Sequence, residues 1–343
     1  MPCAWKTSVL ILLAASYSAG DARAVEPLST RMANAAIAFL ESLSPKQRAL
    51  AQMDYADQRR SDWHWIPKPT RKGLILRDMD PKQRELAHAL LKTGLSDVGY
   101  EKARIILTLE SVLHILEKDR MFVRDPDKYY VTIFGSPSDS GNWGWSFEGH
   151  HLSVNYTLSG GKVVASTPTF FGANPRWMPV DLKVGPKKET RTLDKEERLA
   201  FELLQSLTPD QRKIAYRTEI PNKLLVSGPP TELYRGEPVG LSADKMTPAQ
   251  VKILREILQV YANNVTKEAA EARLGEIEQS GIDGIHYAWF GADRLDGDHF
   301  FRIQGPTFTI ELDNTQADPV GTPSNHIHSL WRHRKNDFGA SSN

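Results

Sequence analysis

The chain has 343 residues, of which 40% are hydrophobic and 25% charged, and its formal net charge at pH 7 is +1. This composition is typical of a globular protein with one large or two small domains. The balanced charge argues against a nucleic-acid-binding protein, because such proteins carry a basic surface.

The first 24 residues have the pattern of a secretory signal peptide. Lys6 precedes an apolar run over 8–15, and an Ala-Arg-Ala sequence at 22–24 fits a cleavage site. The apolar run is too short to span a bilayer, so we predict no stable membrane insertion. We expect cleavage after Ala24 and a periplasmic or secreted protein. The single cysteine, Cys3, lies in this segment, so the mature chain is expected to have no thiolate ligand or nucleophile.

The rest of the chain contains an internal repeat. Leu-Ser-Pro-Lys-Gln-Arg at 43–48 is matched by Leu-Thr-Pro-Asp-Gln-Arg at 207–212, and 78–83 is matched by 245–250. In all four places Ser, Thr or Asp precedes Pro, which is the pattern of a helix N-cap followed by proline in the first turn. Each of these sites is therefore predicted to begin an amphipathic helix.

A second helix and then a series of strands are predicted in each copy, the last of which closes a hairpin. The second helices are expected over 100–118 and 266–280. The strands are expected at 129–135, 145–149, 152–157 and 162–171 in the first copy, where the last two form a hairpin, and at 285–291, 301–305, 308–311 and 325–332 in the second. Two Pro-rich loops, 63–71 and 228–240, are long enough to fold over a site.

We predict an α+β fold made of two tandem helix-helix-strand-strand-strand repeats, packed as a pseudo-symmetric pair with antiparallel sheets. The first repeat spans 25–188 and the second 189–343, and together they form one compact unit. Residues 183–188 are expected to be an exposed linker.

The stretch from 143 to 157 contains the first group of candidate catalytic residues. Its end alternates apolar and polar residues like a half-buried strand, and Glu148, His150 and His151 stand at the entrance. Residues two apart on a strand share a face, so Glu148 and His150 are expected to point together, with His151 opposite, unless Gly149 forms a bulge.

His326 and His328 form the second group of candidate catalytic residues. They also share a face of a predicted strand, beside Glu311 or Asp313. The two copies carry their histidines at different positions, so these residues are not a shared structural requirement. We therefore predict that both groups converge on one cleft between the copies.

Imidazoles with a carboxylate are a suitable ligand set for zinc, iron, copper or manganese. A divalent transition metal is therefore the cofactor to expect, if there is one, and the predicted ligands are His150, His326 and His328. The side chains predicted to bind a small-molecule ligand in the same cleft are Trp143, Trp145, Asn155, Asn174, Arg176, Trp331 and Arg332.

Three long segments, 148–156, 167–175 and 325–332, resemble the signature segments of DUF3500, a bacterial family of unknown function. The resemblance covers nearly the whole mature chain. It implies a secreted or periplasmic protein and no particular activity. His333 departs from the family pattern, which has an acidic residue after the Trp-Arg pair.

Two functions remain open. No P-loop, dinucleotide-binding or nucleophile-elbow motif is present, and no His-Glu-x-x-His helix. The first possibility is an exported enzyme with hydrolytic or oxidative chemistry at the His/Glu site, with or without metal. The second is a binding module for a small ligand, in which tryptophans, including Trp177, stack on the ligand and histidines hydrogen-bond it.

Overall fold

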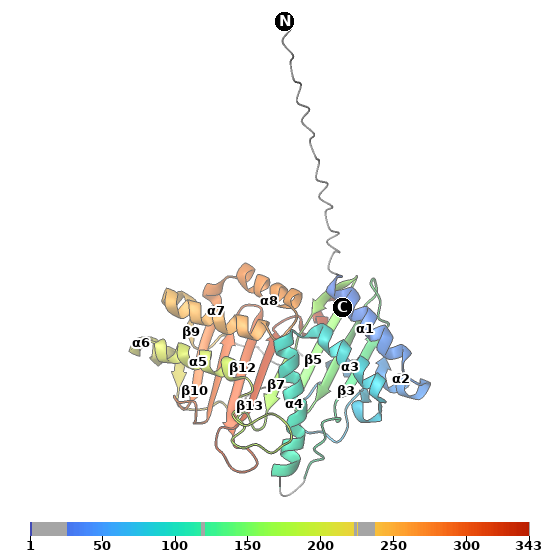
Figure 1. The fold of residues 1–343 in the computed structure, drawn as a ribbon. Coiled ribbons are helices and arrows are strands. Elements are labelled where there is room, and N and C mark those ends of the chain that lie inside the picture. Colours follow the sequence, from blue (N-terminus) through green and yellow to red (C-terminus); the bar gives the residue numbers. More distant parts are fainter. Residues whose placement is uncertain (2–25, 118–120, 223–224, 226–236, 343) are drawn as a thin grey trace.

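A computed structural model describes most of the chain (Figure 1). The residues described are Met1, 26–117, 121–222, 225 and 237–342. Apart from Met1, the predicted signal peptide and its cleavage site lie outside these residues, as does most of the predicted loop over 228–240. Within the described part, no helix combines the length and hydropathy needed to cross a membrane.

A single mixed sheet runs through both halves of the chain, in place of the separate antiparallel sheets that we predicted. All neighbouring strands pair antiparallel except two short parallel pairs, β1 with β3 and β8 with β10. The main path is β1 (Gln52–Met53), β3 (Tyr130–Gly135), β4 (Trp143–Gly149), β5 (Leu152–Ser159), β7 (Thr169–Ala173), β13 (His326–His333), β12 (Phe308–Gln316), β11 (His299–Gln304), β10 (His286–Gly291) and β8 (Tyr216–Arg217). Three short strands branch from this path: β2 (Leu74–Ile75), β6 (Lys162–Ala165) and β9 (Leu241–Ser242).

The helices gather on one face of this sheet (Figure 1). They are α1 (Leu28–Glu41), α2 (Pro45–Ala51), α3 (Pro81–Gly94), α4 (Asp97–Leu116), α5 (Asp194–Ser206), α6 (Pro209–Ala215), α7 (Pro248–Ala262) and α8 (Lys267–Ser280). Short 3₁₀ turns lie at Gln58–Ser61, Leu76–Asp78, Ala243–Lys245, Ile282–Gly284 and Asp337–Ser342. The predicted helices are confirmed, whereas α1 and α5 were not predicted.

All four predicted helix starts are capping boxes. Ser44, Asp80, Thr208 and Thr247 each accept a hydrogen bond from the backbone of a glutamine three residues later, and that glutamine bonds back to the cap. The four glutamines also pair with one another across helices. Gln47 Nε2 lies 2.9 Å from Gln83 Oε1, and Gln211 Nε2 lies 3.0 Å from Gln250 Oε1.

The two faces of the sheet differ in chemistry, although both are buried. On β5, Leu152, Val154 and Tyr156 belong to the apolar core shared with the helices. The alternating residues Ser153 and Asn155 are also buried, so the prediction of a half-buried strand is wrong. The polar face is covered by a second apolar cluster, formed by Trp63, Phe170, Leu330 and Phe338. The predicted loop over 63–71 contributes Trp63 to this layer, which places the loop over the polar face.

Substitution of Gln250 tests the paired glutamines. Gln250 Nε2 donates to the Ser206 carbonyl at 2.8 Å, so Gln250→Ala leaves a part-buried acceptor without its donor and breaks the pair with Gln211. We expect a loss of about 1–3 kcal/mol in unfolding free energy, measured by denaturant titration. Gln259→Ala, at an exposed position of the same helix, is the control and should change stability by less than about 0.5 kcal/mol. Equal losses in the two variants would contradict this role.

Candidate functional site

His150 and His151 form the two-residue turn between β4 and β5, where a continuous strand entrance was predicted. Gly149 pairs with Leu152, and His151 has a φ of 62°. The backbone N–H of His151 donates to the Trp65 carbonyl at 3.0 Å, and its carbonyl accepts from Gly172 N at 2.7 Å. The turn is thus fixed between the 63–71 loop and strand β7.

His326 and His328 lie on β13 and share a face, as predicted. His328 is opposite Asp313 on β12 and opposite Gly172 on β7. Its Nδ1 lies 3.3 Å from Asp313 Oδ2. Of the two predicted carboxylate neighbours, Asp313 is therefore the one in contact.

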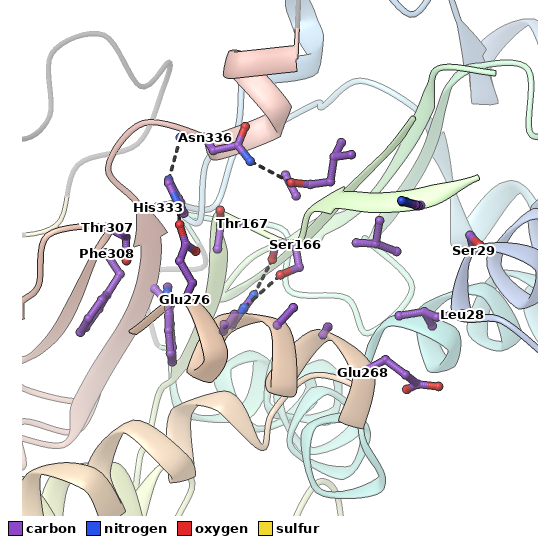
Figure 2. Close-up of a pocket in the computed structure, with 18 of the residues that line it drawn as sticks. Leu28, Ser29, Ser166, Thr167, Glu268, Glu276, Thr307, Phe308, His333 and Asn336 are labelled. Atoms are coloured by element: carbon purple, nitrogen blue, oxygen red, sulfur yellow. Dashed lines mark hydrogen bonds and ion pairs between the residues drawn. The ribbon is translucent and has the colours of Figure 1, made fainter. Parts of the chain in front are cut away.

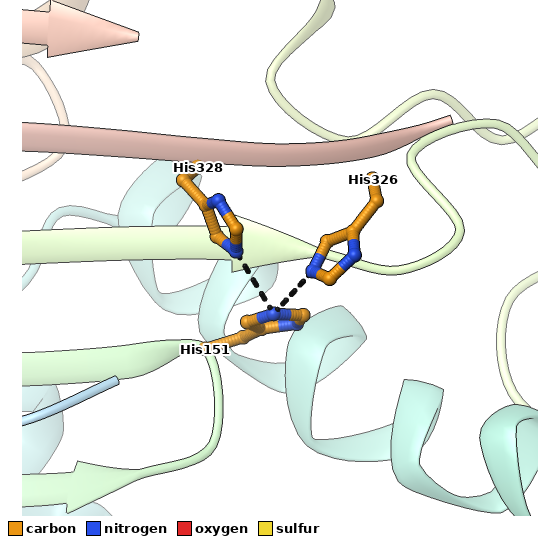
Figure 3. Close-up of side chains that lie close together, drawn as sticks. All are labelled: His151, His326 and His328. Carbon is orange, nitrogen blue, oxygen red and sulfur yellow. Dashed lines mark hydrogen bonds between the residues drawn. The ribbon is translucent and has the colours of Figure 1, made fainter. Parts of the chain in front are cut away.

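The structure brings together the imidazoles of His151, His326 and His328 (Figure 3). Nε2 of His151 lies 2.9 Å from Nε2 of His326 and 3.3 Å from Nε2 of His328. One potential ligand atom from each residue lies within 4.8 Å of the others. The cluster therefore contains His151 where the prediction placed His150.

Gly172 allows these rings to meet. A Cβ at this position would lie 3.0 Å from Cδ2 of His151 and 3.2 Å from Cδ2 of His328. Both distances are tighter than ordinary van der Waals contact, so a side chain here would press the two rings away from β7. Glycine is needed at this position to leave space for the two rings, and not because the backbone has a conformation that only glycine adopts.

The outer nitrogens of two of the rings also have partners. Asp313 contacts Nδ1 of His328, and its carboxylate can only accept a hydrogen bond when ionised. With Asp313 ionised, the hydrogen bond requires the tautomer of His328 that has its proton on Nδ1, and this tautomer has a lone pair on Nε2 facing the cluster. Nδ1 of His326 lies 3.3 Å from Nδ2 of Asn174, so in this orientation the amide donates to the ring. Turning the amide over would let its Oδ1 accept from Nδ1–H and would change the tautomer of the ring.

Burial keeps two of the imidazoles neutral. His151 is 3% exposed, and burial together with the neighbouring imidazoles holds its pKa well below the usual range. The same causes, burial first, lower the pKa of His326 to about 2. Neutral rings are the form that coordinates metal, so these two are competent ligands at neutral pH.

His150 lies behind this cluster and has its own partners. Its ring stacks on that of His151, with centroids 3.7 Å apart. Its Nδ1 lies 2.5 Å from Glu110 Oε1 and 3.1 Å from Arg124 Nη1, and Arg124 is also paired with Glu117. Burial lowers the pKa of His150, although Glu110 opposes the shift.

Glu110 was not predicted as part of the site. It is a buried carboxylate on α4, among the apolar residues that face the core. A charge inside the apolar stripe of an amphipathic helix costs free energy unless it is paired. The place of Glu110 among the apolar residues of the predicted helix was the one signal in the sequence that could have revealed its role.

A cavity of about 750 Å³ adjoins the cluster. His326, Asn174 and His150 form part of its wall, and apolar residues of three loops stand at its edge. Ile66, Phe122 and Val320 are three such residues, and each is more than a third exposed. Through His326, the cluster therefore borders a space large enough for a small molecule.

The other predicted site residues lie elsewhere. Glu148 forms a buried ion pair with Lys72, with Nζ and Oε2 2.6 Å apart, and is not part of the histidine cluster. Trp143 and Trp145 are fully buried in the apolar core, so they offer no surface to a ligand. The remaining predicted ligand-binding residues outside the cluster have partners as follows: Asn155 with Ser153 and Pro168, Arg176 with Glu197, Trp331 with Arg273 and Phe308, and Arg332 with Asp337.

The comparisons with known proteins give a family and no activity. No curated protein matches the chain, and no solved structure does. The model of a family described as a protein of unknown function, DUF3500, matches residues 26–340. That match covers every strand and all eight α-helices of the described chain, and the protein belongs to the DUF3500 family.

Proposed function

We propose that His151, His326 and His328 bind one divalent transition metal through their Nε2 atoms, and that this metal is the centre of an enzyme. The observation that carries the proposal is the convergence of three imidazole Nε2 atoms, from a turn and a strand 175 residues apart in the chain. A shared proton can bridge only some of these nitrogens. A cation can use all three lone pairs at once, and three histidines are a known ligand set for catalytic zinc.

The surroundings of the rings support a metal site. Histidine ligands usually donate their other N–H to a carboxylate, a carbonyl or an amide, which fixes the ring and raises its basicity. Asp313 has this relation to His328. The Asn174 side chain would accept the N–H of His326 in the same way if its amide were turned so that the carbonyl oxygen faced the ring. That oxygen has no other partner among the described residues.

The chemistry that we propose is activation of water for hydrolysis. Three protein ligands leave a coordination position open, and three neutral imidazoles leave the metal its full charge to acidify a bound water. The cavity beside His326 would admit the substrate, and its apolar edge suits a small molecule that is at least partly apolar. An oxidative reaction is the alternative if the metal is iron or copper.

We also infer that the chain arose by duplication, with one copy in 25–188 and the other in 189–343. The paired glutamines support this inference, because each half has the same contact between two glutamine amides. In each half the second glutamine also donates to a backbone carbonyl just before the first capping box, Gln83 to Ser42 and Gln250 to Ser206. The parallel pairing of β1 with β3 recurs as β8 with β10. Gly73 and Gly240, both with positive φ, precede β2 and β9.

Export from a bacterial cytoplasm is a further part of the proposal. Its support is the leader-like pattern of the first 24 residues, and the mature chain would begin just before α1.

Metal analysis of the purified protein is the first test. We expect one transition metal ion per chain and its loss in His151→Ala and His326→Ala. His114→Ala, which changes an exposed histidine on α4, should keep the metal. With Co²⁺ in the site, the visible spectrum should respond to azide and to pH near 7, because an open position holds an exchangeable water. A Co²⁺ spectrum that changes with neither azide nor pH would show a closed structural site and would contradict the proposal of an enzyme.

The space at Gly172 gives a second test. Gly172→Ala adds a methyl group against the rings of His151 and His328, and we expect metal affinity to fall roughly tenfold or more. Competition with a chelator measures the change. Gly275→Ala, at a helical position with open space around it, is the matched control and should bind metal normally. Unchanged affinity in Gly172→Ala would show that the rings do not depend on this gap.

The stability of the metal-free protein should depend on pH through these histidines. His151 and His326 have lowered pKa values in the folded state, whereas in the unfolded chain they titrate near their usual value of about 6.5. The unfolded state therefore binds more protons below that pH, and stability falls as pH falls through about 6.5 and on toward the lowered folded-state values, by up to roughly 1.4 kcal/mol per pH unit for each histidine. Denaturant unfolding in the presence of a chelator measures this slope. The double variant His151→Asn/His326→Asn should have a clearly smaller slope, and an unchanged slope would be inconsistent with two buried neutral rings.

A further inference from the structure

A second cavity, of about 370 Å³, lies on the helix-covered face of the sheet (Figure 2). It is enclosed by α8, the start of α1, strand β6 and the end of β13. Trp331 and His333 line it, whereas His326 and His328 lie at the other end of β13. This cavity shares no lining residue with the one beside the histidine cluster.

Arg273 of α8 is the buried charge in this cavity. It is 7% exposed, and its guanidinium donates to the Ser166 hydroxyl and carbonyl and to Thr169 Oγ1, at 3.0, 2.5 and 2.8 Å. It also lies over the ring of Trp331, 4.9 Å from the centroid. These contacts hold the guanidinium in one place through neutral groups only.

No carboxylate of a described residue lies within ion-pair distance of Arg273. This distinguishes it from the other deeply buried arginines that line or support the sites. Those are paired as Arg124 with Glu117, Arg176 with Glu197, and Arg332 with Asp337. A buried cation without a countercharge is costly, and burial lowers the pKa of Arg273 only to about 10, so it is still charged at neutral pH.

The carboxylates in the lining have other partners. Glu268 is paired with Arg31. Glu276 accepts from Nε2 of His333 at 2.8 Å, and Nδ1 of His333 accepts from the backbone of Asn336 at 2.7 Å (Figure 2). Neither carboxylate is in contact with Arg273. The guanidinium can therefore pair with an anionic group that enters the cavity.

Much of the rest of the wall is apolar, and polar residues such as Lys162, Thr307 and Asn336 complete it. Leu28, Val163, Ala269, Ile277 and Phe308 surround the cavity together with Trp331. A ligand that fits this wall has an apolar body, and a ligand that fits Arg273 has an anionic end capable of accepting hydrogen bonds from a guanidinium.

We propose that this cavity binds a small organic carboxylate with an aliphatic or aromatic body, whose carboxylate contacts Arg273. The site is independent of the proposed metal centre, since the two cavities are separate and lie on opposite faces of the sheet.

Calorimetric titration of the full protein with octanoate and 3-phenylpropanoate, and with the corresponding neutral amides, tests the proposal. We expect at least one carboxylate to bind with a Kd below about 1 mM and its amide to bind at least roughly tenfold more weakly. Arg273→Met should remove the preference for the carboxylate. Affinity should be the same with and without a chelator, because the metal centre does not take part.

Because Arg273 also supports the fold, a second variant is placed at the mouth of the cavity. Ala272 is exposed and lines the cavity, so Ala272→Trp fills the opening from a surface position of α8. We expect it to weaken carboxylate binding at least roughly tenfold, while Ala272→Ser, the control, leaves binding unchanged. Equal affinity for carboxylate and amide, no binding by either carboxylate, or normal binding by Ala272→Trp would each overturn the proposal.

Discussion

The pairing of β7 with β13 is the constraint on which the histidine cluster depends. This antiparallel register places Gly172 opposite His328 and leaves room above the glycine for the ring of His151. A shift of one residue would turn His328 to the helix-covered face and bring a side chain of β7 against the turn. The three rings therefore meet only when the N-terminal and C-terminal strands have joined in one sheet. Metal binding at this place would be coupled to the folding of both halves.

The two faces of the sheet have different roles, one in stability and the other at the candidate site. The helix-covered face supplies most of the buried apolar area, which is the main stabilising contribution in a protein of this size. The opposite face is polar, and its charged side chains are held in pairs such as Lys72 with Glu148 and Arg302 with Glu311. Buried polar groups stabilise a fold only when each has a hydrogen-bond partner, so a whole face of such groups costs free energy that an apolar face would not. A functional role explains this face better than a role in stability does.

Much of the fold was predictable because its signals are local. An N-cap residue, a proline and a glutamine three residues after the cap mark four helices, and alternating residues mark most of the strands. The shared face of His326 and His328 followed from the same alternation. Helices α1 and α5 were missed although both have apolar residues at helical spacing, such as Met32, Ala36 and Phe39 in α1.

The rest could not be predicted because it depends on contacts distant in sequence. Alternation suggested that His150 would join the cluster, but the chain reverses at His150 and His151, and the positive φ of His151 re-aims its ring. The polar residues of β5 looked solvent-exposed because the segment that covers them has no periodic pattern. Trp143 and Trp145 suggested a stacking surface, whereas both fill the core. A buried arginine such as Arg273 has no sequence signature beyond its place on an amphipathic helix.

X-ray absorption spectroscopy of the metal-loaded protein tests the central claim most directly. The account predicts a first shell of three imidazole nitrogens at about 2.0–2.1 Å for zinc, with one further oxygen donor from water. His328→Ala purifies without metal on this account, and when it is reloaded with one equivalent of zinc its spectrum should show one imidazole fewer. A first shell dominated by carboxylate oxygens, or one that is unchanged in that variant, would contradict the assignment of these three histidines as the metal ligands.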